Sequence, residues 1–112
     1  MYYKNGNKYE GDWNNDVREG KGVLIFYDGD KYEGDWKNDK KSGKGIYYYN
    51  DGDRFEGEWE DNKKNGKGTY YYIKSGNKRT GNYSDDKEIG EHTTYYPDGK
   101  MSKKNYENFF EI

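Results

Sequence analysis

The sequence contains no cysteine, one proline and one histidine among its 112 residues. The absence of cysteine excludes disulfide bonds and thiolate metal sites. Aliphatic residues are scarce, with one leucine, two valines and five isoleucines. No window approaches the ~18 consecutive apolar residues typical of a membrane-spanning helix, and residues 1–6 contain no apolar stretch of signal-peptide length. These absences lead us to expect a cytoplasmic protein.

Aromatic residues take the place of the missing aliphatic ones. The chain holds 15 tyrosines, 4 phenylalanines and 3 tryptophans, and its 20 basic residues nearly balance 22 acidic ones. Intrinsically disordered chains have few aromatic residues and a large net charge. The composition therefore predicts a folded domain with a thin aromatic core, which favours a single sheet over a thick globule with a deep catalytic cavity.

A unit of about 23 residues recurs along the chain. The glycines Gly6, Gly29, Gly52, Gly76 and Gly99 lie 23, 23, 24 and 23 residues apart. The segment YEGDW at 9–13 returns at 32–36 and, as FEGEW, at 55–59, and a Gly-Lys-Gly triplet follows each copy. This period divides the chain into a half repeat (1–8), three repeats (9–31, 32–54 and 55–77), a degenerate repeat (78–100) and a C-terminal tail (101–112).

Each repeat has the pattern of a β-hairpin. Large aromatic residues alternate with acidic ones in the first half, which is the period of a strand, and the second half is rich in β-branched and aromatic residues. The glycines at 11, 34 and 57 stand between two large rings of one face, and we expect a ring to lie over each bare backbone.

Two kinds of turn are expected to join the strands. Asp28-Gly29 and Asp51-Gly52 are typical of two-residue type I′ turns. The polar segments 14–21, 37–44 and 60–67 are predicted to be eight-residue loops on the opposite margin. The expected fold is all-β: an elongated single-layer antiparallel meander of about ten strands, built from repeated hairpins.

The aromatic-Glu-Gly-acidic-Trp segment, the Gly-Lys-Gly triplet and the Asp-Gly turn at this spacing resemble MORN (membrane occupation and recognition nexus) repeats. The resemblance covers about residues 9–77 closely and 78–99 loosely. It implies a β-hairpin solenoid with a non-enzymatic scaffold, adaptor or dimerising role near the cytoskeleton, including that of cilia, and membranes. Lipid binding has been proposed for the family.

The fourth copy departs from the pattern. Arg79 stands where the first aromatic residue is expected, Tyr83 replaces tryptophan, His92 replaces the last glycine of the triplet, and one residue is inserted between Tyr72 and Gly81. We interpret this copy as a terminal unit that caps the stack. These departures leave open whether the aromatic row continues beyond residue 77.

The tail differs again from the repeats. Tyr106, Phe109 and Phe110 share one face of a helix at their spacing, which predicts a short C-terminal helix that caps the sheet or docks onto another chain.

The residue types that could take part in catalysis do not occur in a catalytic arrangement. His92 has no partner at a recognisable spacing, and the repeated carboxylate pairs, such as Glu10 and Asp12, are typical of a solvated sheet face. The Asp-Gly-Asp triplets lack the ligand spacing of a calcium loop. We therefore predict no enzyme activity, no catalytic residues, no metal and no cofactor. Nucleic acid is excluded as a partner because a net charge of −2 attracts no phosphate backbone.

Two surfaces are candidates for binding. The first is an aromatic groove that would hold a helix, an extended peptide or a second copy of the chain. Its residues are Tyr9, Trp13, Tyr32, Trp36, Phe55 and Trp59. The alternative is weak, salt-dependent binding of anionic lipid through the loops 37–44 and 60–67. Its residues are Lys40, Lys41, Lys44, Lys63, Lys64 and Lys67. A further alternative, an aromatic platform for cell-wall glycans or choline, would require export.

Overall fold

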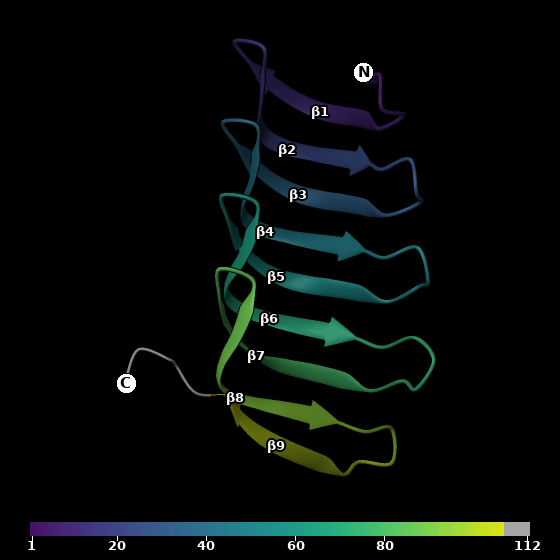
Figure 1. The fold of residues 1–112 in the computed structure, drawn as a ribbon, viewed down its shortest axis with the longest axis vertical. Coiled ribbons are helices and arrows are strands. Elements are labelled where there is room, and N and C mark those ends of the chain that lie inside the picture. Colours follow the sequence, from purple (N-terminus) through teal and green to yellow (C-terminus); the bar gives the residue numbers. More distant parts are fainter. Residues whose placement is uncertain (107–112) are drawn as a thin grey trace.

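The structure is a computed structural model that describes residues 1–106. Nine β-strands follow one another along the chain (Figure 1). They are β1 (Lys8–Asn14), β2 (Val17–Ile25), β3 (Lys31–Lys37), β4 (Lys40–Tyr48), β5 (Arg54–Glu60), β6 (Lys63–Tyr71), β7 (Lys78–Ser84), β8 (Lys87–Tyr95) and β9 (Met101–Tyr106).

All nine strands form one antiparallel sheet in sequence order, with β1 and β9 at its edges (Figure 1). The described part measures 45 × 36 × 21 Å. The predicted all-β, single-layer meander of hairpins is therefore confirmed. Residues 1–106 contain nine strands rather than about ten, because the segment before β1 contributes only a bridge between Tyr2 and Lys8.

The sheet extends past residue 100. Met101–Tyr106 pairs with β8 as strand β9, although we expected this segment to belong to a separate tail. Of the three residues on which the predicted helix rested, Tyr106 belongs to this strand. The rest of the predicted helix, including Phe109 and Phe110, lies outside the described residues.

The expected eight-residue loops are in fact two-residue turns. In the first hairpin only Asn15 and Asp16 separate the strands, and both have positive φ angles of 51° and 67°. Two positive φ angles define a type I′ turn, and asparagine and aspartate tolerate them better than other residues with a β-carbon. The same geometry recurs at 38–39, 61–62 and 85–86. Residues predicted to lie in loops therefore belong to strands.

The Asp-Gly turns are wider than predicted. In the turn after β2, the amide of Gly29 donates to the carbonyl of Phe26 (3.0 Å), and the amide of Phe26 donates to the carbonyl of Asp30 (2.9 Å). Only Gly29 has a positive φ (101°), so this is a three-residue loop ending in glycine and not a type I′ turn. The residue inserted in the fourth copy lengthens the corresponding loop between β6 and β7.

The hairpins are also joined to one another at their tips, on the left in Figure 1. The amide of Asp39 donates to the carbonyl of Arg18 in the preceding hairpin (3.0 Å), and the Asp39 carboxylate accepts the amide of Arg18 (2.6 Å). Asn62 pairs with Lys41, and Asp86 with Lys64, in the same reciprocal way. The turn of each hairpin therefore completes the hydrogen bonding of the hairpin before it.

Candidate functional site

The aromatic side chains on one face of the sheet, which we call the ring face, form a continuous column. Neighbouring rings in the column meet edge to face, with centroids 5.0–5.6 Å apart and interplanar angles of 80–90°. This geometry is the favoured one for aromatic pairs. In order, the column contains Trp13, Tyr9, Trp36, Tyr32, Trp59, Phe55, Tyr83, His92 and Tyr106.

The column is the core of the protein rather than an open groove. Of the six predicted groove residues, only Trp13 is exposed, at 41% of its surface. Tyr9, Tyr32 and Phe55 are fully buried, and Trp36 and Trp59 expose 4% and 6%. The structure does bring all six together, but they pack against one another. A partner cannot reach five of them, because their surfaces are used within the column.

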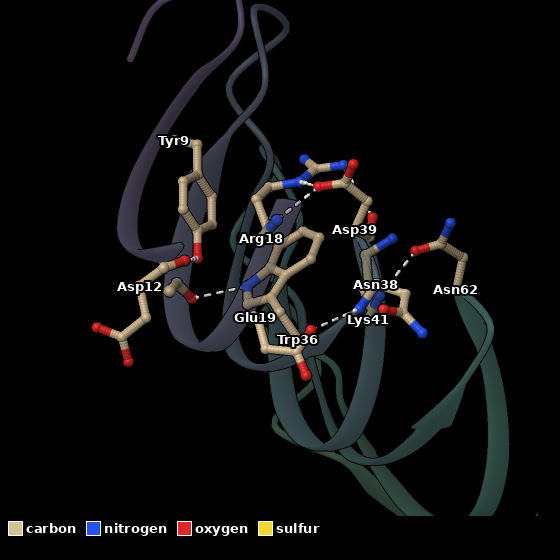
Figure 2. Close-up of polar contacts among 10 residues, drawn as sticks. Tyr9, Asp12, Arg18, Glu19, Trp36, Asn38, Asp39, Lys41 and Asn62 are labelled. Atoms are coloured by element: carbon tan, nitrogen blue, oxygen red, sulfur yellow. Dashed lines mark hydrogen bonds and ion pairs between the residues drawn. The ribbon is translucent and has the colours of Figure 1, made fainter. Parts of the chain in front are cut away.

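The glycines of each repeat make room for these rings. An added β-carbon at Gly22 would collide with the ring and hydroxyl of Tyr9, and one at Gly45 would collide with Tyr32 in the same way. A ring therefore does lie over bare backbone in each repeat, but over the glycine of the paired strand and not, as predicted, over those at 11 and 34. An added β-carbon at Gly11 or Gly34 would first meet the backbone of the neighbouring strand. The Tyr9 hydroxyl donates to the carbonyl of Asp12 (3.0 Å), and the indole of Trp36 donates to the carbonyl of Gly22 (3.1 Å; Figure 2).

The fourth repeat continues the column by exchanging positions. Phe55 on β5 covers Gly68 on β6, whereas in the next hairpin His92 on β8 covers Gly81 on β7. Arg79 takes the register position of Phe55, and its Nε lies 3.0 Å from the carboxylate of Glu88. His92 is fully buried and contacts the carbonyl of Asn82 through Nε2 at 2.8 Å. The aromatic row therefore continues past residue 77, to Tyr106.

One cation from each hairpin covers the column. The Arg18 guanidinium lies 4.5 Å from the ring centre of Trp36 and holds Asp39 by an ion pair (Figure 2). The ammonium of Lys41 lies 5.4 Å from the Trp59 ring, and that of Lys64 lies 4.5 Å from the Phe55 ring. Burial lowers the pKa of both lysines, and the charge of Asp86 opposes that shift.

The six predicted lipid-contact lysines do not form one basic surface. Lys41 and Lys64 lie on the rings, as described above. Lys40 and Lys63 are exposed beside the hairpin turns, and Lys44 and Lys67 point from the opposite face of the sheet. The prediction of two basic loops is wrong, because the two-residue turns leave these lysines on strands, where alternation sends neighbours to opposite faces.

The opposite face of the sheet carries an open groove of about 850 Å³. We call this side the groove face. One row of side chains crosses six strands in direct register from β1 to β6: Glu10, Val23, Glu33, Ile46, Glu56 and Thr69. A second row alternates Lys21, Lys44 and Lys67 with acidic residues, because Asp35 lies opposite Lys21 and Glu58 opposite Lys44. The bare backbones of the glycines at 11, 22, 34, 45, 57 and 68 lie between the two rows. Within residues 1–106 no other element covers this groove.

The charged residues of the two rows have different ion-pair partners. Asp35 accepts the amide of Lys44 (3.2 Å) and also pairs with the ammonium of Lys21, which helps to lower the pKa of the Asp35 carboxyl despite partial burial. In the other row, Glu10 pairs with Lys8 (3.0 Å) and Glu56 with Arg54 (2.7 Å). Glu33, at the centre, forms no ion pair with any residue in the described part.

Sequence reasoning missed this groove because it sought the binding surface among the rings. The carboxylates at 10, 33 and 56 were interpreted as a solvated face. The available signal was the exact recurrence of Glu, a β-branched residue and Lys at one position each per repeat, on the face opposite the rings.

The comparisons with known proteins agree with the repeat architecture. A family model described as the MORN repeat matches residues 9–31, 32–54 and 55–78. No curated protein matches the chain. No helix in residues 1–106 is long and apolar enough to cross a membrane. Because the matched segments cover more than half of the sequence and coincide with its hairpins, the chain belongs to the MORN repeat family.

Proposed function

We propose that this protein is a non-enzymatic scaffold that binds an extended segment of a protein partner in the groove. The observation that carries the proposal is the uncovered groove itself, which crosses the sheet from β1 to β7. Seven strands spaced ~4.8 Å apart give a length of about 29 Å, and this suits a chain of several residues. The proposal keeps the cytoplasmic setting expected from the sequence and the location near cytoskeletal or membrane-associated structures that the MORN resemblance implies.

The width of the groove favours an extended chain over a helix. The two rows stand two residues apart along each strand, or about 6.6 Å. A helix with its side chains is about 10–12 Å in diameter and is too wide to lie between them. The bare glycine backbone between the rows allows close approach, and the β-branched residues of the glutamate row offer apolar contact. The charged residues of both rows can orient the bound segment.

The other candidate occupants have less support. Self-association through the ring face would require buried rings to become accessible. Weak binding of anionic phospholipids needs a cluster of basic side chains on one surface. The six candidate lysines are divided among the rings, the hairpin turns and the groove.

A peptide selection tests the proposal. Random peptides displayed on phage are selected against the wild-type protein. Their binding is then measured against Ile46→Glu, which replaces an apolar residue of the glutamate row by a charge. The matched control is Ile73→Glu, because Ile73 is 59% exposed and lies in a turn outside the groove. We expect Ile46→Glu to weaken binding at least 10-fold and Ile73→Glu to leave it unchanged. Selected peptides that bind Ile46→Glu as tightly as wild type would contradict the proposal.

A further inference from the structure

We infer that the groove selects partner segments with a lysine or arginine at every third position, in polyproline II conformation. This inference rests on the proposed function, and it adds the chemistry and the spacing of the segment that is bound. It is drawn from the carboxylate row, which presents one glutamate per hairpin.

The spacing of the glutamates sets the spacing of the basic residues. Glu10, Glu33 and Glu56 lie on alternate strands of one register row, so consecutive carboxylates are two strand spacings apart, about 9.6 Å. Three residues of polyproline II advance about 9.3 Å and return a side chain to the same side. Two residues of a β-strand advance only about 6.6 Å and lose register with the carboxylates after one step.

The charges give the row its preference for cations. Glu33 stands between Val23 and Ile46 and has no ion pair in the described residues, so a basic side chain there would meet a carboxylate that no other cation already holds. Its flanking aliphatic residues can contact the methylene stem of a lysine. At the two outer positions the carboxylates are already paired, Glu10 with Lys8 and Glu56 with Arg54. A cation of the partner segment would share each carboxylate with the basic residue that already holds it.

The lysine row makes the groove two-sided. Lys21, Lys44 and Lys67 stand across the glycine backbone from the glutamates. Asp35 and Glu58 stand in the same row, opposite Lys21 and Lys44, so this side of the groove carries both signs of charge. Polyproline II has three residues per turn, which lets a segment place its basic residues toward the glutamates and neutral side chains toward the mixed row.

Synthetic peptides of about nine residues test the spacing. One peptide has lysine at every third position in a proline-rich background, and a second has the same composition with its lysines at every second position. We expect the first to bind more tightly by at least about 3-fold, with an affinity that falls as salt rises from about 0.05 to 0.5 M. Equal affinities would overturn the inference, and so would the absence of binding by either peptide at about 1 mM.

A charge exchange tests the carboxylate. Glu33→Lys should lower the affinity for the first peptide by about 5-fold or more. The control variant Glu60→Lys should not change this affinity, because Glu60 lies beside a turn outside the groove. A peptide with glutamate in place of its central lysine should bind Glu33→Lys better than wild type, a reversal that a folding defect cannot produce. If the exchange fails but Ile46→Glu still abolishes binding of selected peptides, the charge rule is wrong and the groove remains a binding site. If Ile46→Glu has no effect on selected peptides, the proposed function itself fails.

Discussion

His92 lies over Gly81 on the neighbouring strand, as Phe55 lies over Gly68 one hairpin earlier. His92 comes from β8, the second strand of its hairpin, whereas Phe55 comes from β5, the first strand of its hairpin. Two further positions change with it: Arg79 replaces the ring residue, and Glu88 takes the position of the cation Lys64. The fourth repeat is therefore an alternative solution to the same packing problem, in which three positions change together.

This exchange predicts strong coupling among the three positions. Gly68→His alone should destabilise the protein by about 2–3 kcal/mol, because the new ring collides with Phe55. The triple variant Phe55→Arg, Lys64→Glu, Gly68→His should recover at least half of that loss, as expected of neighbouring residues. Urea unfolding followed by tryptophan fluorescence measures both. A triple variant no more stable than Gly68→His would show that the exchange depends on the end of the sheet.

The type I′ turns predict a difference between glycine and alanine. Asn38 has a φ of 51°, which costs a residue with a β-carbon about 1 kcal/mol and costs glycine little. Asn38→Gly should leave the free energy of unfolding within about 0.5 kcal/mol of wild type, and Asn38→Ala should lower it by about 1 kcal/mol. Equal effects, measured by thermal and urea unfolding, would contradict the turn assignment.

The half-buried lysine on the ring column should be replaceable by an apolar residue. Burial lowers the pKa of Lys41, which means that the folded protein disfavours its charged form. Lys41→Met keeps the length of the side chain and removes the charge, so it should keep or raise stability by up to about 1 kcal/mol. Lys40→Met, at an exposed neighbouring position, is the control and should change stability by less than about 0.5 kcal/mol. A clear loss in Lys41→Met would mean that the cation–π contacts outweigh the cost of burial.

The tyrosines of the ring face predict unfolding at alkaline pH. Burial raises the pKa of Tyr49 and of Tyr83 to about 12, whereas an unfolded tyrosine titrates near 10. Because the folded pKa is the higher one, the stabilisation is fully present below pH ~10 and is lost as the pH rises toward 12. Circular dichroism and phenolate absorbance should therefore change together in this range.

Two conservative variants separate this effect from general alkaline damage. Tyr49→Phe should reduce the loss of stability above pH 10, whereas Tyr27→Phe should not, since Tyr27 is 77% exposed. Complete tyrosine ionisation with an unchanged circular dichroism spectrum at pH 12 would contradict this explanation.

The sequence predicted the repeat and the strands because both depend on local periodicity. It predicted rings over glycine but chose Gly11 instead of its strand partner Gly22, because that pairing is set by the register. It misassigned the turns because Asp28-Gly29 and Asn15-Asp16 both accept positive φ, and only the register of the strands distinguishes them. The continuation of the column through His92 could not be foreseen, since it depends on residues exchanged between two paired strands.

The binding face was misassigned for a related reason. Tyr32 and Trp36 suggested an interface by residue type, but in a thin sheet such rings are needed for the core. The groove is defined by Glu33, Val23 and Ile46 on three different strands. Their common row appears only when the register is known.

The reciprocal bonds between successive turns, such as those between Arg18 and Asp39, have a consequence for how such chains can change in length. The backbone groups at the tip of each hairpin form hydrogen bonds with the turn of the next hairpin, and not with a distant part of the described sheet. Adding or deleting a whole hairpin therefore leaves every remaining junction of the same kind. It also lengthens or shortens the row of glutamates by one residue. The number of repeats therefore determines the length of the partner segment that the groove can bind.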